Sequence, residues 1–122
     1  MRKRAEFEHI QRSGTRVNTE RFVLIFSAQS EPAAATRLGI TASRRIGNAV
    51  ARNRAKRLVR AAFGATHELF PAGLDLVVVV RKPLGELKLA AVVEEWRGAT
   101  SAIRRRIAEL LAPKPAGAKA SP

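Results

Sequence analysis

The most distinctive side chains of the sequence are the basic ones in the middle of the chain. No acidic residue occurs between Pro32 and His67. The interval contains eight basic residues, which are Arg37, Arg44, Arg45, Arg52, Arg54, Lys56, Arg57 and Arg60. A solvated helix surface normally includes Asp or Glu, because opposite charges four residues apart stabilise a helix and like charges destabilise it. The run therefore predicts binding to a polyanion rather than a surface that faces only water.

On a helix, most of these cations would gather on one side. Projected at about 100° per residue, the polar residues fall within an arc of about 140°. They are Arg52, Asn53, Lys56, Arg57 and Arg60. A separate arc of about 100° holds Ala51, Ala55, Leu58, Val59 and Ala62. The pattern predicts one buried side and one cationic side with Arg54 at its edge, and the planar fork of arginine suits phosphate.

The chain offers no recognisable catalytic or metal centre of its own. It has no cysteine, which excludes disulfides, cysteine–zinc sites and thiol nucleophiles. A protein nuclease needs a general base, metal-binding carboxylates or a pair of histidines, but His9 and His67 are isolated. Glu94 and Glu95 are adjacent, so on a helix they point to different sides. We therefore predict no catalytic residue and no metal ligand in this chain.

The net charge narrows the class of partner. The 122 residues include 23 Arg and Lys against 10 Asp and Glu, which gives a formal net charge of +13. Such an excess repels itself in a folded protein, so nucleic acid or an anionic membrane surface is the expected partner. No apolar run follows the basic N-terminus, and the longest apolar stretch, Leu76 to Val80, is too short to span a bilayer. We therefore expect a cytoplasmic protein with no membrane partner.

The hydrophobic pattern predicts a single domain over residues 1–112 and a disordered Pro/Ala/Gly/Lys tail over residues 113–122. We expect a helix over residues 5–13 and then extended chain over 15–27, which includes a buried strand at 22–26. A strand over 37–43 and a helix from an Asn48 N-cap to about Ala65 follow. The last two elements are a strand over 74–81 and a helix over 89–111 that Gly98 weakens. This order, helix-strands-helix-strand-helix, predicts an α+β two-layer sandwich in which a helix connects two central strands.

The central segment resembles the signature of the ribonuclease P protein family. The resemblance rests on residues 37–60, RLGITASRRIGNAVARNRAKRLVR, which match that signature almost without gaps. Flanking matches are residues 7–14 to the first helix of the family, 22–24 to its strand and 73–83 to its later strand and turn. The resemblance covers roughly residues 5–111, so it is far more specific than an isolated Arg-Asn-Arg motif. Ala55 stands where the family usually has a larger aliphatic residue.

Membership would imply a fold similar to domain 2 of ribosomal protein S5, with a left-handed βαβ crossover between parallel central strands. It would also imply the role of protein subunit in ribonuclease P, where an RNA subunit carries out catalysis. The protein would bind that RNA, in a 1:1 complex, beside the precursor tRNA. It would help to hold the 5′ leader and so promote removal of the leader and maturation of the tRNA 5′ end. Mg²⁺ would be bound mainly by the RNA subunit.

The resemblance also implies roles for individual residues. Those that would face the RNA subunit are Arg44, Arg45, Arg52, Asn53, Arg54, Lys56, Arg57 and Arg60. Phe7 and Ile10, with one face of the sheet, would line the cleft for the single-stranded leader, although Phe7 could equally be a core residue. We expect the larger apolar side chains elsewhere to be core, namely Phe22, Leu24, Phe26 and Trp96.

Two other functions fit parts of the pattern. A structural RNA-binding protein of ribosomal type would share the size, the charge and the α+β form, so only the motif run separates it from the first interpretation. A DNA-binding protein could place residues 52–60 in a major groove. That function predicts dimer symmetry or a recognisable reading head, and the sequence shows neither.

Overall fold

The structure is a computed structural model that describes residues 15–29 and 36–111. The helix predicted over residues 5–13, which includes Phe7 and Ile10, lies outside the described residues, as does the predicted tail.

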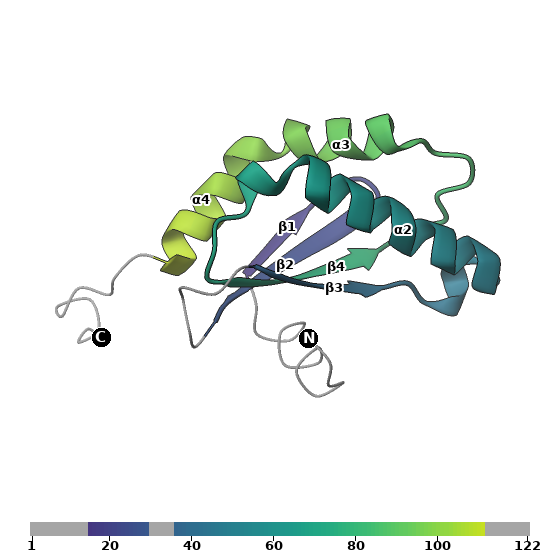
Figure 1. Cartoon of the computed structure of the whole chain (residues 1–122), viewed down its shortest axis with the longest axis horizontal. Coiled ribbons are helices and arrows are strands. Elements are labelled where there is room, and N and C mark those ends of the chain that lie inside the picture. Colours follow the sequence, from purple (N-terminus) through teal and green to yellow (C-terminus); the bar gives the residue numbers. More distant parts are fainter. Residues whose placement is uncertain (1–14, 30–35, 112–122) are drawn as a thin grey trace, which may run out of the picture.

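The described strands form one sheet under a layer of helices (Figure 1). The strands are β1 (Thr15–Asn18), β2 (Phe22–Ala28), β3 (Arg37–Thr41) and β4 (Leu74–Val80). Their order is β1-β2-β4-β3, with β1–β2 and β2–β4 antiparallel and β3–β4 parallel. The extended chain predicted before residue 28 is therefore a hairpin. The mixed α+β fold class predicted from the sequence is confirmed.

One detail of the predicted topology is wrong. The two strands joined by the helix are not both central, because β3 lies at the edge of the described sheet and β4 lies inside it. The residues explain the difference. Leu76, Val77 and Val78 are all fully buried, so β4 needs cover on both faces and suits an interior position. On β3, by contrast, Arg37 is exposed, and Leu38 and Ile40 are only partly buried, which suits an edge.

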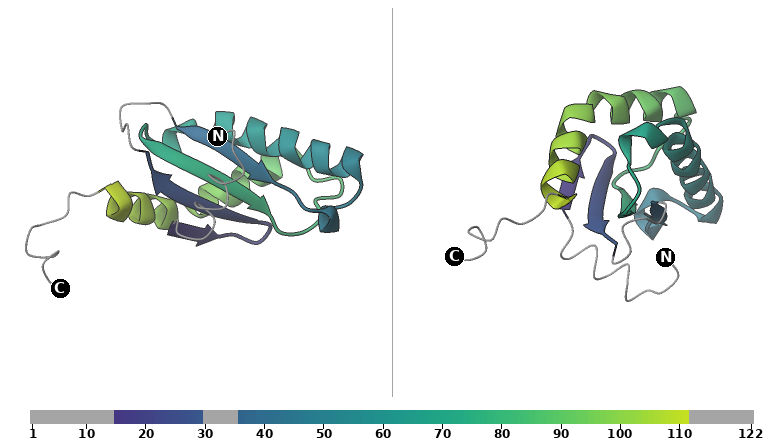
Figure 2. Two further views of the ribbon diagram at one scale, coloured as in Figure 1. Left: turned by 90° about the horizontal axis from the view of Figure 1, so that it is seen from below. Right: turned by 60° about the vertical axis from the view of Figure 1, so that its left-hand side comes forward.

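The α-helices of the described residues cover the same face of the sheet (Figure 2). They are α2 (Ala49–Ala65), α3 (Leu89–Gly98) and α4 (Thr100–Leu111). The prediction of a helix from an Asn48 N-cap to Ala65 is confirmed, and the Asn48 side chain accepts a hydrogen bond of 2.9 Å from the backbone N–H of Ala51. This bond satisfies one of the N–H groups that the first turn of any helix leaves without an internal partner.

The C-terminal helix is broken, whereas the sequence predicted one helix over residues 89–111. α3 ends at Gly98 and α4 begins at Thr100. The hydroxyl of Thr100 donates a 2.6 Å hydrogen bond to the carbonyl oxygen of Arg97 and so satisfies one of the carbonyls at the end of α3. The change of direction lets α4 pack against β1 and β2 and bury Ile103 and Ile107.

The main core lies between the helices and the sheet. Phe22, Leu24, Phe26 and Trp96 are completely buried, as predicted. The rings of Phe22 and Trp96 meet edge to face, with centroids 5.8 Å apart, an arrangement that aromatic pairs favour. Ala55 is 1% exposed, so its small side chain belongs to the packing of α2 on this core.

The opposite face of the sheet carries a second, smaller apolar cluster. Ile25 on β2 and Val77 on β4 are cross-strand partners and are both fully buried. Val23 and Val79, a cross-strand pair on the same face, are partly buried against them. Alternation along the strands places these side chains away from the helices.

A carboxylate fixes α3 to the β1–β2 turn. Glu95 accepts hydrogen bonds from the Thr19 hydroxyl, from the Arg21 backbone N–H at 2.8 Å and from the Arg21 guanidinium at 2.7 Å. Burial alone would raise the pKa of Glu95, but these hydrogen bonds favour the ionised form more strongly and hold its pKa below the ordinary value. The ionised group therefore joins the helix layer to the sheet.

Candidate nucleic-acid interface

The predicted RNA-facing residues begin in a tight turn before α2. Arg44, Arg45 and Ile46 form a single 3₁₀ turn, in which the arginines are exposed and Ile46 is buried. Gly47 follows with φ of +139°, a conformation that residues with a Cβ rarely adopt. A Cβ at Gly47 would lie 2.9 Å from the Cβ of Ala51. Glycine is therefore needed to bring the two arginines next to the first turn of α2.

The predicted cationic face of α2 lies on the surface. Asn53, Arg57 and Arg60 are exposed, whereas Arg52 and Lys56 are partly exposed. The buried side of the helix holds Ala55, Val59 and Ala62, as the helical projection predicted. The cationic face is defined here as Arg52, Asn53, Lys56, Arg57 and Arg60, with Arg44 and Arg45 at its N-terminal end.

The cations of this face have no acidic partner among the residues that the structure describes. Salt bridges there join Arg21 to Glu20 and Glu95, Arg37 to Asp75, Arg97 to Glu68, and Arg106 to Glu109. All of these arginines lie outside α2. No salt bridge in the described chain thus involves the cationic face, and its positive charge stays available to an external anion.

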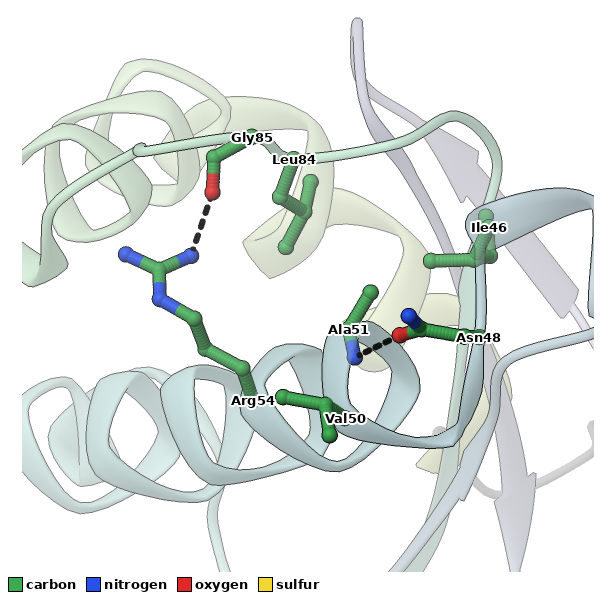
Figure 3. A pocket seen from close by; sticks show the side chains of 7 residues that line it. All are labelled: Ile46, Asn48, Val50, Ala51, Arg54, Leu84 and Gly85. Atoms are coloured by element: carbon green, nitrogen blue, oxygen red, sulfur yellow. Dashed lines mark hydrogen bonds between the residues drawn. The ribbon is translucent and has the colours of Figure 1, made fainter.

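Arg54 differs from the other predicted RNA-facing residues, because its partly exposed guanidinium is hydrogen-bonded to another segment of the protein. It donates a 2.7 Å hydrogen bond to the carbonyl oxygen of Gly85 in the loop between β4 and α3 (Figure 3). A second hydrogen bond, of 2.6 Å, goes to the carbonyl oxygen of Leu87 in the same loop. The helical projection placed Arg54 at the edge of the cationic face, but nothing in the sequence indicated which loop would lie beside it.

Arg37 is also used within the fold. Its Nε and one terminal nitrogen donate to the two carboxylate oxygens of Asp75, at 2.7 and 2.8 Å. The two residues are cross-strand partners in the parallel β3–β4 pair. This bidentate geometry satisfies the buried carboxylate of Asp75, which is 7% exposed. In the sequence Arg37 belongs to the cationic run, because the strand register that pairs it with Asp75 is not visible there.

The described residues contain no group of three or more His, Cys, Asp or Glu side chains arranged to hold a metal ion. Within the same part of the chain, no helix is both long enough and apolar enough to cross a membrane. The chemistry that the described site offers is thus the binding of anions by arginine and lysine.

Comparisons with known proteins agree with the family that the motif suggested. The ribonuclease P family model matches residues 1–107. A relative named ribonuclease P protein component, from Brevibacillus brevis, is 40% identical over 92 residues, which cover 75% of this chain and 72% of the relative. A relative of the same name from Desulfovibrio desulfuricans is 37% identical over 89 residues, which cover 73% of this chain and 68% of the relative.

Solved structures show the same fold. The ribonuclease P protein of Thermotoga maritima matches with a TM-score of 0.72 and 31% identity, over 86% of this chain and 94% of that chain. The ribonuclease P protein of Staphylococcus aureus matches with a TM-score of 0.71 and 26% identity, over 87% and 95% of the two chains. These matches separate the first interpretation from the ribosomal and DNA-binding alternatives. The chain belongs to the ribonuclease P protein family.

Proposed function

We propose that this chain is the protein subunit of a bacterial ribonuclease P and that the RNA subunit carries out the cleavage. The observation that carries the proposal is the cationic face of α2, which has no acidic partner among the described residues, in a chain that belongs to this family. In this role the protein binds the RNA subunit beside the precursor tRNA and promotes removal of the 5′ leader.

The cationic face supports this role through electrostatics. Two RNA molecules repel each other through their phosphates, and cations that neutralise phosphates release counterions and favour assembly. Because Ala55, Val59 and Ala62 fix α2 on the core, the charges are held in place before RNA arrives. The arginines bind and orient phosphate through their charge and their planar fork of N–H donors.

We place the leader on the face of the sheet away from the helices. The proposal follows from the family resemblance, which assigns this cleft to Phe7 and Ile10, both outside the described residues. The partly buried pair of Val23 and Val79 on this face supports it, because single-stranded RNA presents unstacked bases that can contact apolar side chains.

Three further parts of the proposal concern composition and place. We expect Mg²⁺ to be held mainly by the RNA subunit, because a chain of net charge +13 disfavours a divalent cation. We expect one protein per RNA subunit, and we expect the complex to act in the cytoplasm.

The test is reconstitution with a cognate ribonuclease P RNA at low, near-physiological Mg²⁺. Adding the protein should restore cleavage of precursor tRNA at the mature 5′ end. Arg57→Ala plus Arg60→Ala should reduce this stimulation without changing the thermal unfolding of the protein. As a matched control, Ala61→Ser changes an exposed position of the same helix without removing charge. Absence of stimulation by the wild-type protein with an active RNA would sink the proposal.

A further inference from the structure

A pocket lies between the first turns of α2 and the loop that connects β4 to α3. Its volume is about 420 Å³, within the range of roughly 300–1,000 Å³ usual for small-ligand sites. Three segments line it, and Figure 3 shows their side chains: Ile46, Asn48, Val50, Ala51, Arg54, Leu84 and Gly85. A mainly apolar lining with a few polar groups is the composition expected of a site for a flat organic ring.

Val50 is an exposed apolar residue that lines this pocket. It is 73% exposed, far more than the other exposed large hydrophobic residues of the described chain, Leu89 at 38% and Leu111 at 39%. Buried Ile46 and Leu84 lie on the other segments that line the pocket. An apolar contact made with Val50 would remove surface from water without disturbing the core.

Arg54 gives the pocket a rigid, flat wall. Its two hydrogen bonds, to Gly85 and Leu87, lie in the plane of the guanidinium and fix the orientation of that plane. Two of its five N–H donors are therefore occupied by carbonyls of the loop. The flat faces of a guanidinium are surfaces on which RNA bases stack.

The surroundings of the pocket are positively charged. Each lining segment carries an exposed cation near its lining residues: Arg45 before Ile46, Arg57 one turn after Arg54, and Lys82 before Leu84. Over residues 36–66 and 81–88 the only acidic residue is Glu86. A partner that combines negative charge with an apolar ring fits this arrangement better than an apolar peptide side chain does.

We propose that the pocket receives one unpaired nucleobase of the RNA subunit. The base stacks on Arg54 and contacts Val50, while its flanking phosphates lie on Arg45, Arg57 and Lys82. This inference rests on the proposed function and adds a base-binding subsite to the phosphate-binding face.

The test compares three substitutions in the full-length protein by measuring the Kd for cognate ribonuclease P RNA over a series of salt concentrations. Val50→Ser removes apolar contact but no charge. It should therefore raise Kd about fivefold or more at every salt concentration and leave the salt slope unchanged. Arg57→Ala should lower the salt slope by about one unit. Ala61→Ser should bind like the wild type.

Chemical probing of the RNA bases locates the contact. One unpaired base should be protected from dimethyl sulfate (A or C) or from a carbodiimide (G or U) by the wild-type protein and by Ala61→Ser, and should become reactive again with Val50→Ser. Wild-type Kd for Val50→Ser, or the same protection pattern with both serine variants, would overturn the base pocket. The proposed function would then still stand if Arg57→Ala lowers the slope. Failure of the wild-type protein to bind the RNA would instead remove both proposals.

Discussion

Arg54 on α2 donates a hydrogen bond of 2.6 Å to the carbonyl oxygen of Leu87, two residues before α3 begins. At the other end of the same helix pair, Arg97 on α3 donates to the carbonyl oxygen of Ala65, the last residue of α2. α2 and α3 are thus joined by an arginine at each end. One of these arginines, Arg54, belongs to the cationic run of the sequence, so we expect its loss to lower the stability of the fold.

Arg54→Ala and Arg57→Ala should therefore separate in their effects on stability. Removing Arg54 leaves two carbonyls without their charged donor and should lower the free energy of unfolding by about 1–3 kcal/mol. Arg57 is exposed and has no acidic partner in the described chain, so its removal should change stability by less than about 0.5 kcal/mol. Urea unfolding of both variants measures the difference. Equal stabilities would mean that the Arg54 bonds do not hold α2 to the loop.

Stability should depend on pH through Glu95. Its pKa is depressed in the folded protein, so the ionised group stabilises the fold at any pH above the ordinary value of 4.5. That contribution should disappear as pH falls from 4.5 through the lower folded pKa. Glu95→Gln should lower stability at pH 7 by roughly 1.5–3 kcal/mol and flatten the acid limb of the stability curve.

Glu68 serves as a control for Glu95. The Arg97 guanidinium also lowers the pKa of Glu68, but the Glu68 side chain is 46% exposed. Glu68→Gln should change the acid limb less than Glu95→Gln does, because solvent screens an exposed pair. If the two variants gave the same curve, the Glu95 bonds to the β1–β2 turn would not be the cause. Chemical denaturation at several pH values between 3 and 7 provides the measurement.

Gly47 and Gly64 should respond in opposite ways to alanine. Gly47→Ala forces a Cβ into a positive-φ position beside Ala51 and should cost about 1–3 kcal/mol. Gly64 lies inside α2, and a Cβ added there would have no neighbour within 4 Å, so Gly64→Ala should stabilise by about 0.5–1 kcal/mol. Thermal and urea unfolding would test both. A neutral Gly47→Ala would show that the turn before α2 tolerates a side chain.

Phe7→Ala tests the proposed leader cleft, although Phe7 lies outside the described residues. A Phe that contacts the single-stranded leader should, when removed, weaken binding of precursor tRNA by the reconstituted complex. Binding of mature tRNA, which has no leader, should not change. Loss of one stacked base costs about 1–3 kcal/mol, which an equilibrium binding assay resolves. Equal weakening for both RNAs would place Phe7 in the core.

Local sequence alone determined the elements around α2. Asn48 predicted the N-cap, the alternation of apolar and basic residues predicted the buried and cationic sides, and the continuous valine run predicted a strand covered on both faces. These features depend on residues a few positions apart, so helix and strand periodicity is enough to derive them. The motif over residues 37–60 added the family, which the comparisons confirmed.

Tertiary structure decided which of the eight cations remain available to an external anion. Arg37 meets Asp75 only because the β3–β4 register pairs residues 38 positions apart. Arg54 meets Gly85 and Leu87 only because the loop before α3 passes beside the first turns of α2. Such partners are distant in sequence and are selected by the packing of whole elements, which one-dimensional periodicity does not encode. The sequence therefore placed the charge on α2, and the fold determined which arginines hold the protein together.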